Sequence, residues 1–399
     1  MTDWIAEERR YLFQNYGRQP VVIERGLGAR VWDVDGNEYL DFVGGIAVNV
    51  LGHSHPAVVR AVAEQAAQLI HTSNLFYTKP MIELARMLVE HSRLDRAFFC
   101  NSGTEAVEAA IKLARRWGRD TRAGAYEIIT TQDGFHGRTL GALSATGTSR
   151  YREPFEPLLP GFAIVPWNDL NAVRAATSER TVAVMLEPIQ GEGGVNMPAP
   201  GYLAGLREWC TERGLLLIFD EVQTGIGRTG ELFAFQHEGL RPDILVLAKG
   251  LAGGVPIGAI LAREDVAAHF YKGDHGSTFG GNPLATAAAL ATLREVVAPG
   301  FLARARASSA RLLARLRAIE DRHELVTSVR GRGMLLAIGL ARECSAQVVD
   351  ECRRRGLLVN NVRPDAIRLL PPLNVTDEEI DRACDVLEAA IASLDAPPK

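Results

Sequence analysis

The stretch RAFFCNSGTEAVEAAIKLAR (residues 96–115) joins a short apolar run to a helical pattern through a few small and polar residues. RAFFC has the composition of a buried β-strand, and residues 104–116 predict an amphipathic helix. Similar apolar runs, several followed by helical patterns, occur at residues 125–130, 162–166, 182–188, 215–220 and 244–249. Because strands that alternate with helices pair in parallel, the sequence predicts an α/β fold built on a mainly parallel sheet.

The length of the chain indicates more than one domain. With 399 residues it exceeds what one hydrophobic core usually serves. We expect a large domain over residues 55–290, which carries the parallel sheet. We expect a small α+β domain to combine residues 1–54, with a hairpin turning at residues 35–37, and residues 291–399. A long helical pattern at residues 282–318 would connect the two.

The bulk composition limits the classes of function. Hydrophobic residues make up 47% of the chain and charged residues 23%, and the net charge is −4, so no nucleic acid or anionic membrane is expected as a partner. Five scattered cysteines favour neither a disulfide framework nor a zinc site. The N-terminus does not read as a signal peptide, and no apolar run approaches the ~18 residues of a membrane helix. We expect a cytoplasmic protein that acts on small molecules.

The residues that follow RAFFC are candidates for binding an anion. Ligands of an open parallel sheet bind at the carboxyl ends of its strands. Ser102, Gly103 and Thr104 lie at such an end and begin a helix, whose free backbone N–H groups and positive dipole can bind a phosphate. The same residues would also form an ordinary N-cap, which is the commoner role of such a segment.

Two charged residues end neighbouring apolar runs. Asp220 ends one run, and Lys249 ends the next within LVLAKGLAGGVPIGA (residues 245–259), which contains no acidic residue. A lysine in such surroundings either reaches solvent from a turn or is kept neutral as a nucleophile or Schiff-base former. An acid after a buried strand also resembles P-loop nucleotide hydrolases, but the sequence contains no Gly-Lys-Ser or Gly-Lys-Thr for their phosphate loop.

The candidates gain significance as a set. A phosphate-binding helix end, a carboxylate, a lysine and an aromatic side chain, here Phe135 in DGFHGRTLGA (residues 133–142), are what pyridoxal phosphate requires. The phosphate needs the helix end, the pyridine nitrogen an acid, the aldehyde a lysine and the ring a flat neighbour. Each residue alone is more often structural, but together they predict pyridoxal 5'-phosphate as cofactor.

Seven motifs in order resemble the class III, fold-type I aminotransferases, and within them the acetylornithine aminotransferases. The resemblance covers nearly the whole chain, and the motifs are NSGTEAVEAAIKLAR, FHGRTLGALS, EPIQGEGGV, FDEVQTGIGRTG, LAKGLAGGVPIGA, STFGGNP and IRLLPPLNV. It implies a mainly parallel, seven-stranded type of sheet between helices, with a small α+β domain made from both chain ends. It also implies a homodimer with active sites at the interface.

The resemblance assigns roles around the cofactor. Lys249 would attach the cofactor covalently and act as the base, Asp220 would pair with the pyridinium nitrogen, and Gln223 would bind the ring hydroxyl. Phe135 would stack on the ring, and Thr278 would reach the phosphate bound by the neighbouring subunit. The cofactor-binding set implied in this way is Ser102, Gly103, Thr104, Phe135, Asp220, Val222, Gln223, Lys249 and Thr278.

The resemblance also assigns substrate residues. Arg138 would bind the carboxylate of the amine donor, with Ser277 nearby. Arg368 would bind the α-carboxylate of 2-oxoglutarate, and Glu192 would shield Arg368 while the donor is bound. Gly45 and Ile46 stand where related ornithine aminotransferases have a tyrosine for the free α-amino group, which favours an acylated donor.

The expected reaction is transfer of the δ-amino group of N2-acetylornithine to 2-oxoglutarate, giving N-acetylglutamate 5-semialdehyde and glutamate in arginine biosynthesis. Alternatives within the class are donors such as succinyl-diaminopimelate, 4-aminobutyrate, ornithine or a carrier-linked intermediate of lysine synthesis. A cofactor-binding regulator without turnover is an alternative from another class. His53 and His55 lack a third metal ligand nearby and favour a helix start, so no metal is expected. His136 has no predicted role.

Overall fold

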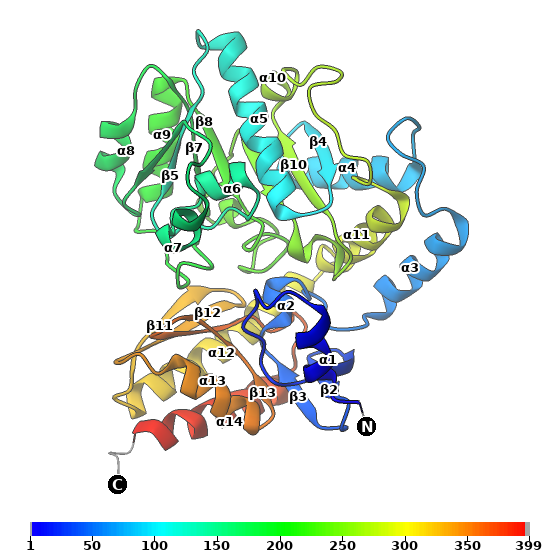
Figure 1. The fold of residues 1–399 in the computed structure, drawn as a ribbon, viewed down its shortest axis with the longest axis vertical. Coiled ribbons are helices and arrows are strands. Elements are labelled where there is room, and N and C mark those ends of the chain that lie inside the picture. The colour runs from blue at the N-terminus through cyan, green and yellow to red at the C-terminus, as the bar shows by residue number, and fades with distance from the viewer. Residues whose placement is uncertain (1, 396–399) are drawn as a thin grey trace.

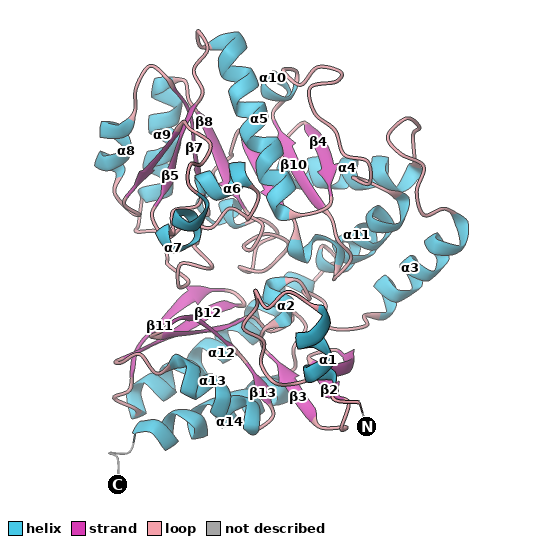
Figure 2. Cartoon of the chain, viewed as in Figure 1, coloured by secondary structure: helices cyan, strands magenta, loops and turns pink. Residues whose placement is uncertain are grey.

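The computed structural model describes residues 2–395, which form an upper part around one large sheet and a lower part around two smaller sheets (Figure 1). Helices cover both parts (Figure 2). The strands are β1 (Ile23–Leu27), β2 (Arg30–Asp33), β3 (Glu38–Asp41), β4 (Arg96–Cys100), β5 (Glu127–Thr131), β6 (Phe162–Val165), β7 (Thr181–Leu186), β8 (Leu216–Asp220), β9 (Ile244–Leu247), β10 (Gly258–Ala262), β11 (Val326–Arg332), β12 (Leu335–Leu340), β13 (Leu357–Leu358), β14 (Asn360–Arg363) and β15 (Ala366–Leu369). The α-helices are α1 (Trp4–Tyr11), α2 (Gly44–Ala47), α3 (Pro56–Gln68), α4 (Lys79–Ser92), α5 (Gly103–Thr121), α6 (Leu140–Ala145), α7 (Ser149–Arg152), α8 (Leu170–Ala176), α9 (Tyr202–Arg213), α10 (Glu264–Ala267), α11 (Pro283–Val296), α12 (Phe301–Arg322), α13 (Ser345–Arg354) and α14 (Asp377–Asp395).

The large sheet has seven strands in the order β4-β10-β9-β8-β7-β5-β6. β10 runs antiparallel to both of its neighbours, and β5 to β9 pair in parallel. Alternate residues of β9 pack into separate clusters, Ile244 and Val246 with α5 and Leu245 and Leu247 with the main core. Both faces of the sheet are therefore covered, and the predicted α/β class with a mainly parallel sheet is confirmed.

Each predicted strand forms within a few residues of its expected bounds, but β10 was not predicted. Its short apolar run follows Pro256, and only its first two residues, Gly258 and Ala259, belong to the stretch around Lys249 (residues 245–259). An antiparallel strand inserted between β4 and β9 leaves no βα signature in the sequence. Tertiary pairing, rather than local pattern, places this strand.

The lower part contains two four-stranded sheets, β1-β2-β3-β13 and β11-β12-β15-β14. β13 pairs in parallel with β3, with Leu357 opposite Leu40, so segments from both chain ends share one sheet. The expected division of the chain at residues 54 and 290 stays a prediction, and residue 290 lies within α11.

The predicted pattern at residues 282–318 forms two helices rather than one. α11 and α12 meet at an angle of 71°. The chain turns there because Pro299 cannot continue a helix and Gly300 has a φ of 82°, which suits glycine. Among residues 2–395 no single helix is long and apolar enough to cross a membrane, and only this bent pair meets the length and composition criteria when its two helices are counted together.

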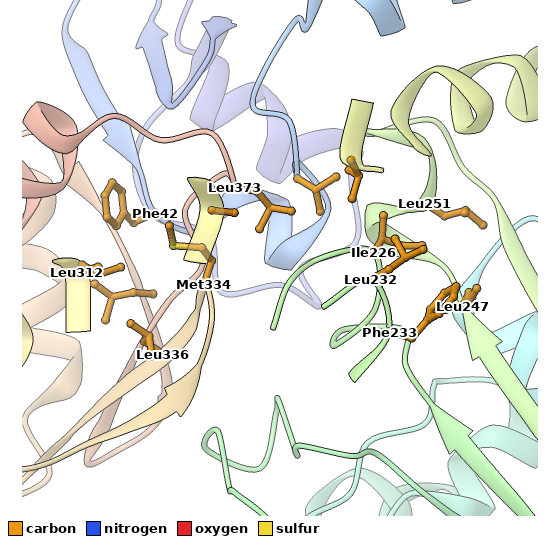
Figure 3. Close-up of a cluster of buried hydrophobic side chains, with 14 of the residues drawn as sticks. Phe42, Ile226, Leu232, Phe233, Leu247, Leu251, Leu312, Met334, Leu336 and Leu373 are labelled. Atoms are coloured by element: carbon orange, nitrogen blue, oxygen red, sulfur yellow. The ribbon is translucent and has the colours of Figure 1, made fainter. Parts of the chain in front are cut away.

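A shared hydrophobic core joins the two parts (Figure 3). Leu247 and Leu251 from the upper part continue through Ile226 to Met334 and Leu336 of the lower part, and all of these side chains are buried. Removing such a continuous apolar surface from water favours one fixed arrangement of the two parts. Residues that lie on either side of this core can therefore contribute to one site.

Candidate active site

A cavity of about 360 Å³ lies at the carboxyl ends of β4, β8 and β9. This volume is within the range of small-molecule sites. Nine of the predicted site residues line it, namely Ser102, Gly103, Thr104, Phe135, Arg138, Asp220, Val222, Gln223 and Lys249. The lining also includes His136, Glu187 and Val48, whereas Glu192, Ser277, Thr278 and Arg368 lie outside it.

Lys249 begins a short 3-10 helix one residue after the end of β9. Its φ of 39° lies in the left-handed region, where a residue with a side chain costs of the order of 1–3 kcal/mol. Burial lowers the pKa of its amine, although the carboxylate of Glu192 acts in the opposite direction. The fold thus holds this lysine in a strained conformation, in surroundings that favour the neutral amine needed for a nucleophile or a base.

Asp220 forms a buried pair with His136, a residue for which the sequence predicts no role. His136 Nδ1 lies 2.8 Å from Asp220 Oδ2, and both residues are buried. Burial alone would lower the pKa of His136, but the hydrogen bond and the charge of Asp220 raise it overall. The Asp220 carboxylate is therefore held in place from the side of His136, and its Oδ1 accepts a hydrogen bond from the Val222 N–H at 3.1 Å.

Glu187 lies at the end of β7 next to this pair and is also buried. Its carboxylate accepts hydrogen bonds from the backbone N–H groups of Phe135 and Gly191, both at 3.0 Å. Burial raises the pKa of Glu187 to about 7, since these bonds and the nearby His136 offset only part of the desolvation. Glu187 holds the loop that carries Phe135 against the end of β7.

The N-terminus of α5 opens onto the cavity. Ser102 is the N-cap, and its hydroxyl accepts a hydrogen bond from the Glu105 N–H. The first N–H groups of a helix have no partners inside the helix, so those of Gly103 and Thr104 remain available to an anion. A Cβ on Gly103 would lie 3.0 Å from Val222, so the close approach of these two segments suits glycine.

Phe135 and Arg138 belong to one loop at the rim of the cavity. The Arg138 guanidinium lies over the ring of Tyr151 at 4.0 Å and over that of Phe135 at 5.4 Å. The rings of Phe135 and Tyr151 meet edge to face with centroids 6.0 Å apart. Tyr151 was not predicted, and α7, which carries it, contains too few residues for a periodic signal. These cation–π contacts orient an exposed arginine.

Glu192, Gln223 and Arg368 form a hydrogen-bonded triangle beside the cavity. Arg368 Nη1 donates to Glu192 Oε1 at 2.6 Å and to Gln223 Oε1 at 3.0 Å, and Gln223 Nε2 donates to Glu192 Oε1 at 3.1 Å. Arg368 lowers the pKa of Glu192 to about 2 against the opposing effect of burial. The amide of Gln223, expected to bind a ring hydroxyl, is occupied by the other two side chains in this arrangement.

The segment with Ser277 and Thr278 lies at the outer edge of the cavity. The Ser277 hydroxyl accepts a hydrogen bond at 3.1 Å from Asn101, which lines the cavity. Thr278 is exposed and faces a separate small recess that includes His71 and Phe76. Within one chain, Thr278 is therefore apart from the other predicted cofactor residues.

The cavity fits pyridoxal phosphate by the chemistry of its lining. A helix N-terminus for the phosphate, a buried carboxylate backed by a histidine, a partly buried lysine and an aromatic ring all face one space. The residues that would hold the cofactor are Gly103 and Thr104 at its phosphate, Asp220 at its ring nitrogen and Lys249 at its aldehyde. Within residues 2–395, no group of three or more His, Cys, Asp or Glu side chains could hold a metal ion.

Comparison with known proteins agrees with this chemistry. The model of the aminotransferase class-III family matches residues 11–391. An acetylornithine aminotransferase of Caldanaerobacter subterraneus is 49% identical over 98% of this chain and 99% of its own. Among solved structures, an ornithine aminotransferase of Toxoplasma gondii superimposes with a TM-score of 0.95 at 38% identity, covering 98% of this chain and 95% of that one. An N-acetylornithine aminotransferase of Stenotrophomonas maltophilia superimposes with a TM-score of 0.85 at 40% identity, covering 98% and 99%.

Proposed function

The chain belongs to the class-III aminotransferase family, and we propose that it transfers the δ-amino group of N2-acetylornithine to 2-oxoglutarate. It is a pyridoxal-phosphate-dependent aminotransferase. The observation that carries the proposal is that Lys249, Asp220 and the N-terminus of α5 line one cavity. The products would be N-acetylglutamate 5-semialdehyde and glutamate, and we propose that the enzyme serves arginine biosynthesis in the cytoplasm.

Asp220 and His136 act on the side of the cofactor ring. When bound, pyridoxal phosphate withdraws electrons from the substrate carbon that carries the amine, which makes the C–H bond there acidic. Asp220, which is buried, would pair with the ring nitrogen and favour its protonated form. His136 fixes the orientation of that carboxylate through the 2.8 Å contact between its Nδ1 and Asp220 Oδ2.

Lys249 is the residue that accepts the proton from the substrate carbon. Its side chain lines the cavity, and the lowered pKa of the amine favours the neutral form that can accept a proton. General base catalysis of this kind contributes about 10²- to 10⁴-fold to a rate. The left-handed backbone conformation of Lys249 belongs to the arrangement that brings its side chain to the cavity.

The triangle of Glu192, Gln223 and Arg368 lets one site accept two unlike substrates. With the donor bound, Glu192 neutralises Arg368 and no substrate carboxylate is needed there. When 2-oxoglutarate binds, its α-carboxylate takes the place of Glu192, whose side chain is 25% exposed and can turn towards solvent. We propose that Arg138, at the rim, binds the other end of each substrate, and that Ser277, which accepts a hydrogen bond from Asn101 of the cavity lining, contacts the donor.

The segment before α3 supports an acylated donor. Val48 lines the cavity, and it follows a run of positive φ values from Gly44 to Ala47. An apolar side chain at this position offers no partner to a free α-amino group, whereas an acyl group can pack against it. We therefore expect acetylornithine to be preferred over ornithine.

A panel of donors tests the substrate. We expect kcat/KM for acetylornithine to exceed those for ornithine, 4-aminobutyrate and succinyl-diaminopimelate, each measured with 2-oxoglutarate as acceptor. A higher value for ornithine or 4-aminobutyrate would contradict the argument from Val48. Protein that binds the cofactor, as its visible absorbance would report, but turns over none of these donors would instead be a regulator.

We propose a homodimer whose interface includes Thr278. Two neighbouring segments, residues 74–77 and 277–280, expose the large apolar side chains of Leu75, Phe76, Tyr77 and Phe279. Asn74 joins the two segments by donating hydrogen bonds to the carbonyls of Ser277 and Gly280. An apolar patch of this kind on a protein surface favours association. Thr278 would then reach the phosphate site of the partner subunit.

Mixing two variants tests the shared site. In a hybrid of Lys249→Ala and Thr278→Asp chains, one of the two sites would combine an intact Lys249 with an intact Thr278 from the other chain. We expect the mixed and refolded sample to regain about a quarter of wild-type activity, while neither variant alone exceeds a few per cent. No gain on mixing, with dimers present by sedimentation, would place Thr278 outside the shared site.

A further inference from the structure

Arg228 is a buried cation for which the chemistry above has no use. Together with Arg368 it is among the largest side chains without solvent exposure. Burial alone lowers the pKa of its guanidinium to about 9, and no carboxylate acts on it. Two of its nitrogen atoms, Nε and Nη2, have no hydrogen-bond partner among the described residues. A cation kept under such conditions costs stability and calls for a specific role.

The hydrogen bonds of Arg228 cross between the two parts of the molecule. Arg228 lies in the segment that follows Asp220 in the upper part, and its Nη1 donates to the carbonyls of Met334, at 3.1 Å, and Pro371, at 2.5 Å. Its own carbonyl accepts from the Met334 N–H at 2.9 Å. Figure 3 shows Met334 within the apolar core that joins the two parts.

The two acceptor carbonyls lie at one end of the strand pair that carries Arg368. Leu336 of β12 pairs with Leu369 of β15 in antiparallel register, so Met334 and Pro371 are opposite each other two residues further along. Leu335 and Leu369 are the last residues of these strands at that end. The Arg228 guanidinium therefore bridges β12 and β15 at the point where the regular hydrogen bonds between the two strands end.

The backbone around this contact leaves little room for adjustment. A Cβ on Gly333, whose φ is 62°, would lie 2.3 Å from the carbonyl carbon of Thr229. The segment after Asp220 thus lies directly on the turn that leads into β12. That same segment carries Gln223, which donates a hydrogen bond to Glu192 and accepts one from Arg368.

We propose that Arg228 is a positioning residue that holds Arg368 at the correct distance from the cavity for the 2-oxoglutarate carboxylate. Arg228 lies in the segment that follows Asp220, and its hydrogen bonds tie this segment to the end of the β12–β15 strand pair, which carries Arg368. Arg228 itself touches no substrate. The inference rests on the proposed function, in which Arg368 binds the acceptor and not the donor. Loss of Arg228 should therefore act selectively on the acceptor half-reaction.

The test compares Arg228→Lys with Arg306→Lys in the holoenzyme. Arg306 is a matched control, because its Nη1 also donates to a backbone carbonyl of the same segment, that of Gly230 at 2.7 Å, but its side chain is exposed. We expect Arg228→Lys to raise KM for 2-oxoglutarate about tenfold, with kcat and the donor half-reaction within twofold, since a lysine cannot reach both carbonyls in the same geometry. Arg306→Lys should change neither half-reaction by more than twofold.

Calorimetric binding of glutarate, a dicarboxylate that cannot react, gives a readout independent of turnover. We expect its Kd to rise about tenfold in Arg228→Lys and to stay unchanged in Arg306→Lys. Equal losses in both half-reactions, or unchanged acceptor and glutarate binding in both Arg228→Lys and Arg228→Met, would overturn the proposal. A wild-type enzyme that does not use 2-oxoglutarate at all would instead overturn the proposed function, and the inference with it.

Discussion

The two sides of the cavity are built in different ways. On the Asp220 side, defined by Asp220, His136 and Glu187, all three side chains are buried and come from one sheet and its loops. On the Arg368 side, defined by Glu192, Gln223 and Arg368, the arginine comes from β15 of the lower part, and the Glu192 side chain keeps 25% of its surface exposed. A buried charge with one fixed partner suits a constant task, and a charge with an exchangeable partner suits a site that alternates between substrates.

Removal of Lys249, which lies between the two sides, should have the largest effect. We expect Lys249→Ala to reduce turnover by about 10⁴-fold, since within residues 2–395 no other amine lines the cavity to take its place as base. The comparison variant is Lys112→Ala, because Lys112 is exposed and contacts Asp274 and His275 at the surface. A residual rate within 100-fold of the wild type in single-turnover measurements would show that another group serves as base.

The Asp220 side should be the more sensitive of the two. We expect Asp220→Asn to lower kcat for both half-reactions by about 10³-fold, because an uncharged amide cannot keep the ring nitrogen protonated. Asp243→Asn is a matched control: Asp243 is also buried, but it pairs with Arg207 and Arg263 at 2.7 Å, away from the cavity. The Asp243→Asn variant should have a lower Tm than the wild type and a kcat within twofold of it. An Asp220→Asn variant that damaged one half-reaction only would remove the distinction between the two sides.

Each substitution on the Arg368 side should mainly affect one of the two half-reactions. We expect Arg368→Ala to reduce kcat/KM for 2-oxoglutarate by about 100-fold, the value of one charge-assisted pair of hydrogen bonds, and to affect the donor half-reaction less than tenfold. Glu192→Gln should do the reverse on a smaller scale, lowering kcat/KM for the donor several-fold, because Arg368 then lacks a counter-charge while the donor is bound. Equal damage to both half-reactions by either variant would contradict an exchange of partners.

The same difference explains what could be predicted from the sequence. Asp220 and Lys249 end consecutive parallel strands, and the carboxyl ends of parallel strands meet at one edge of a sheet, so their order in the chain was enough to bring them together. Arg368 lies on an antiparallel strand of another sheet, and no period in the sequence relates β15 to β8. Only the resemblance to a known family supplied that residue.

Other features required tertiary packing. The contact between His136 and Asp220 joins a glycine-rich loop to a strand 84 residues away, and a loop carries no periodic signal. The break between α11 and α12 was readable from Pro299 and Gly300, yet the apolar pattern on both sides obscured it. Arg228 gave no signal, because its acceptors are backbone carbonyls and any residue supplies those.

Stability should depend on pH in opposite ways on the two sides. Burial raises the pKa of Glu187 to about 7 from 4.5, so the folded protein holds a proton there that the unfolded chain releases. This contribution to stability is fully present below pH 4.5 and is lost as the pH rises through 7, amounting to about 3 kcal/mol at most. Arg368 lowers the pKa of Glu192 to about 2, so its contribution is present above pH 4.5 and is lost as the pH falls towards 2.

Of Glu187 and Glu192, therefore, only Glu187 should titrate between pH 5 and 8. We expect Glu187→Gln to reduce the decline of Tm over this range, even though the amide can accept only one of the two backbone hydrogen bonds and lowers Tm at pH 5. Glu192→Gln should leave that slope unchanged. The slope, unlike Tm at a single pH, separates the proton held by Glu187 from the general cost of each substitution. Identical slopes in the wild type and Glu187→Gln would mean that Glu187 is already ionised at pH 5, and that the Asp220 side carries one more negative charge than we infer.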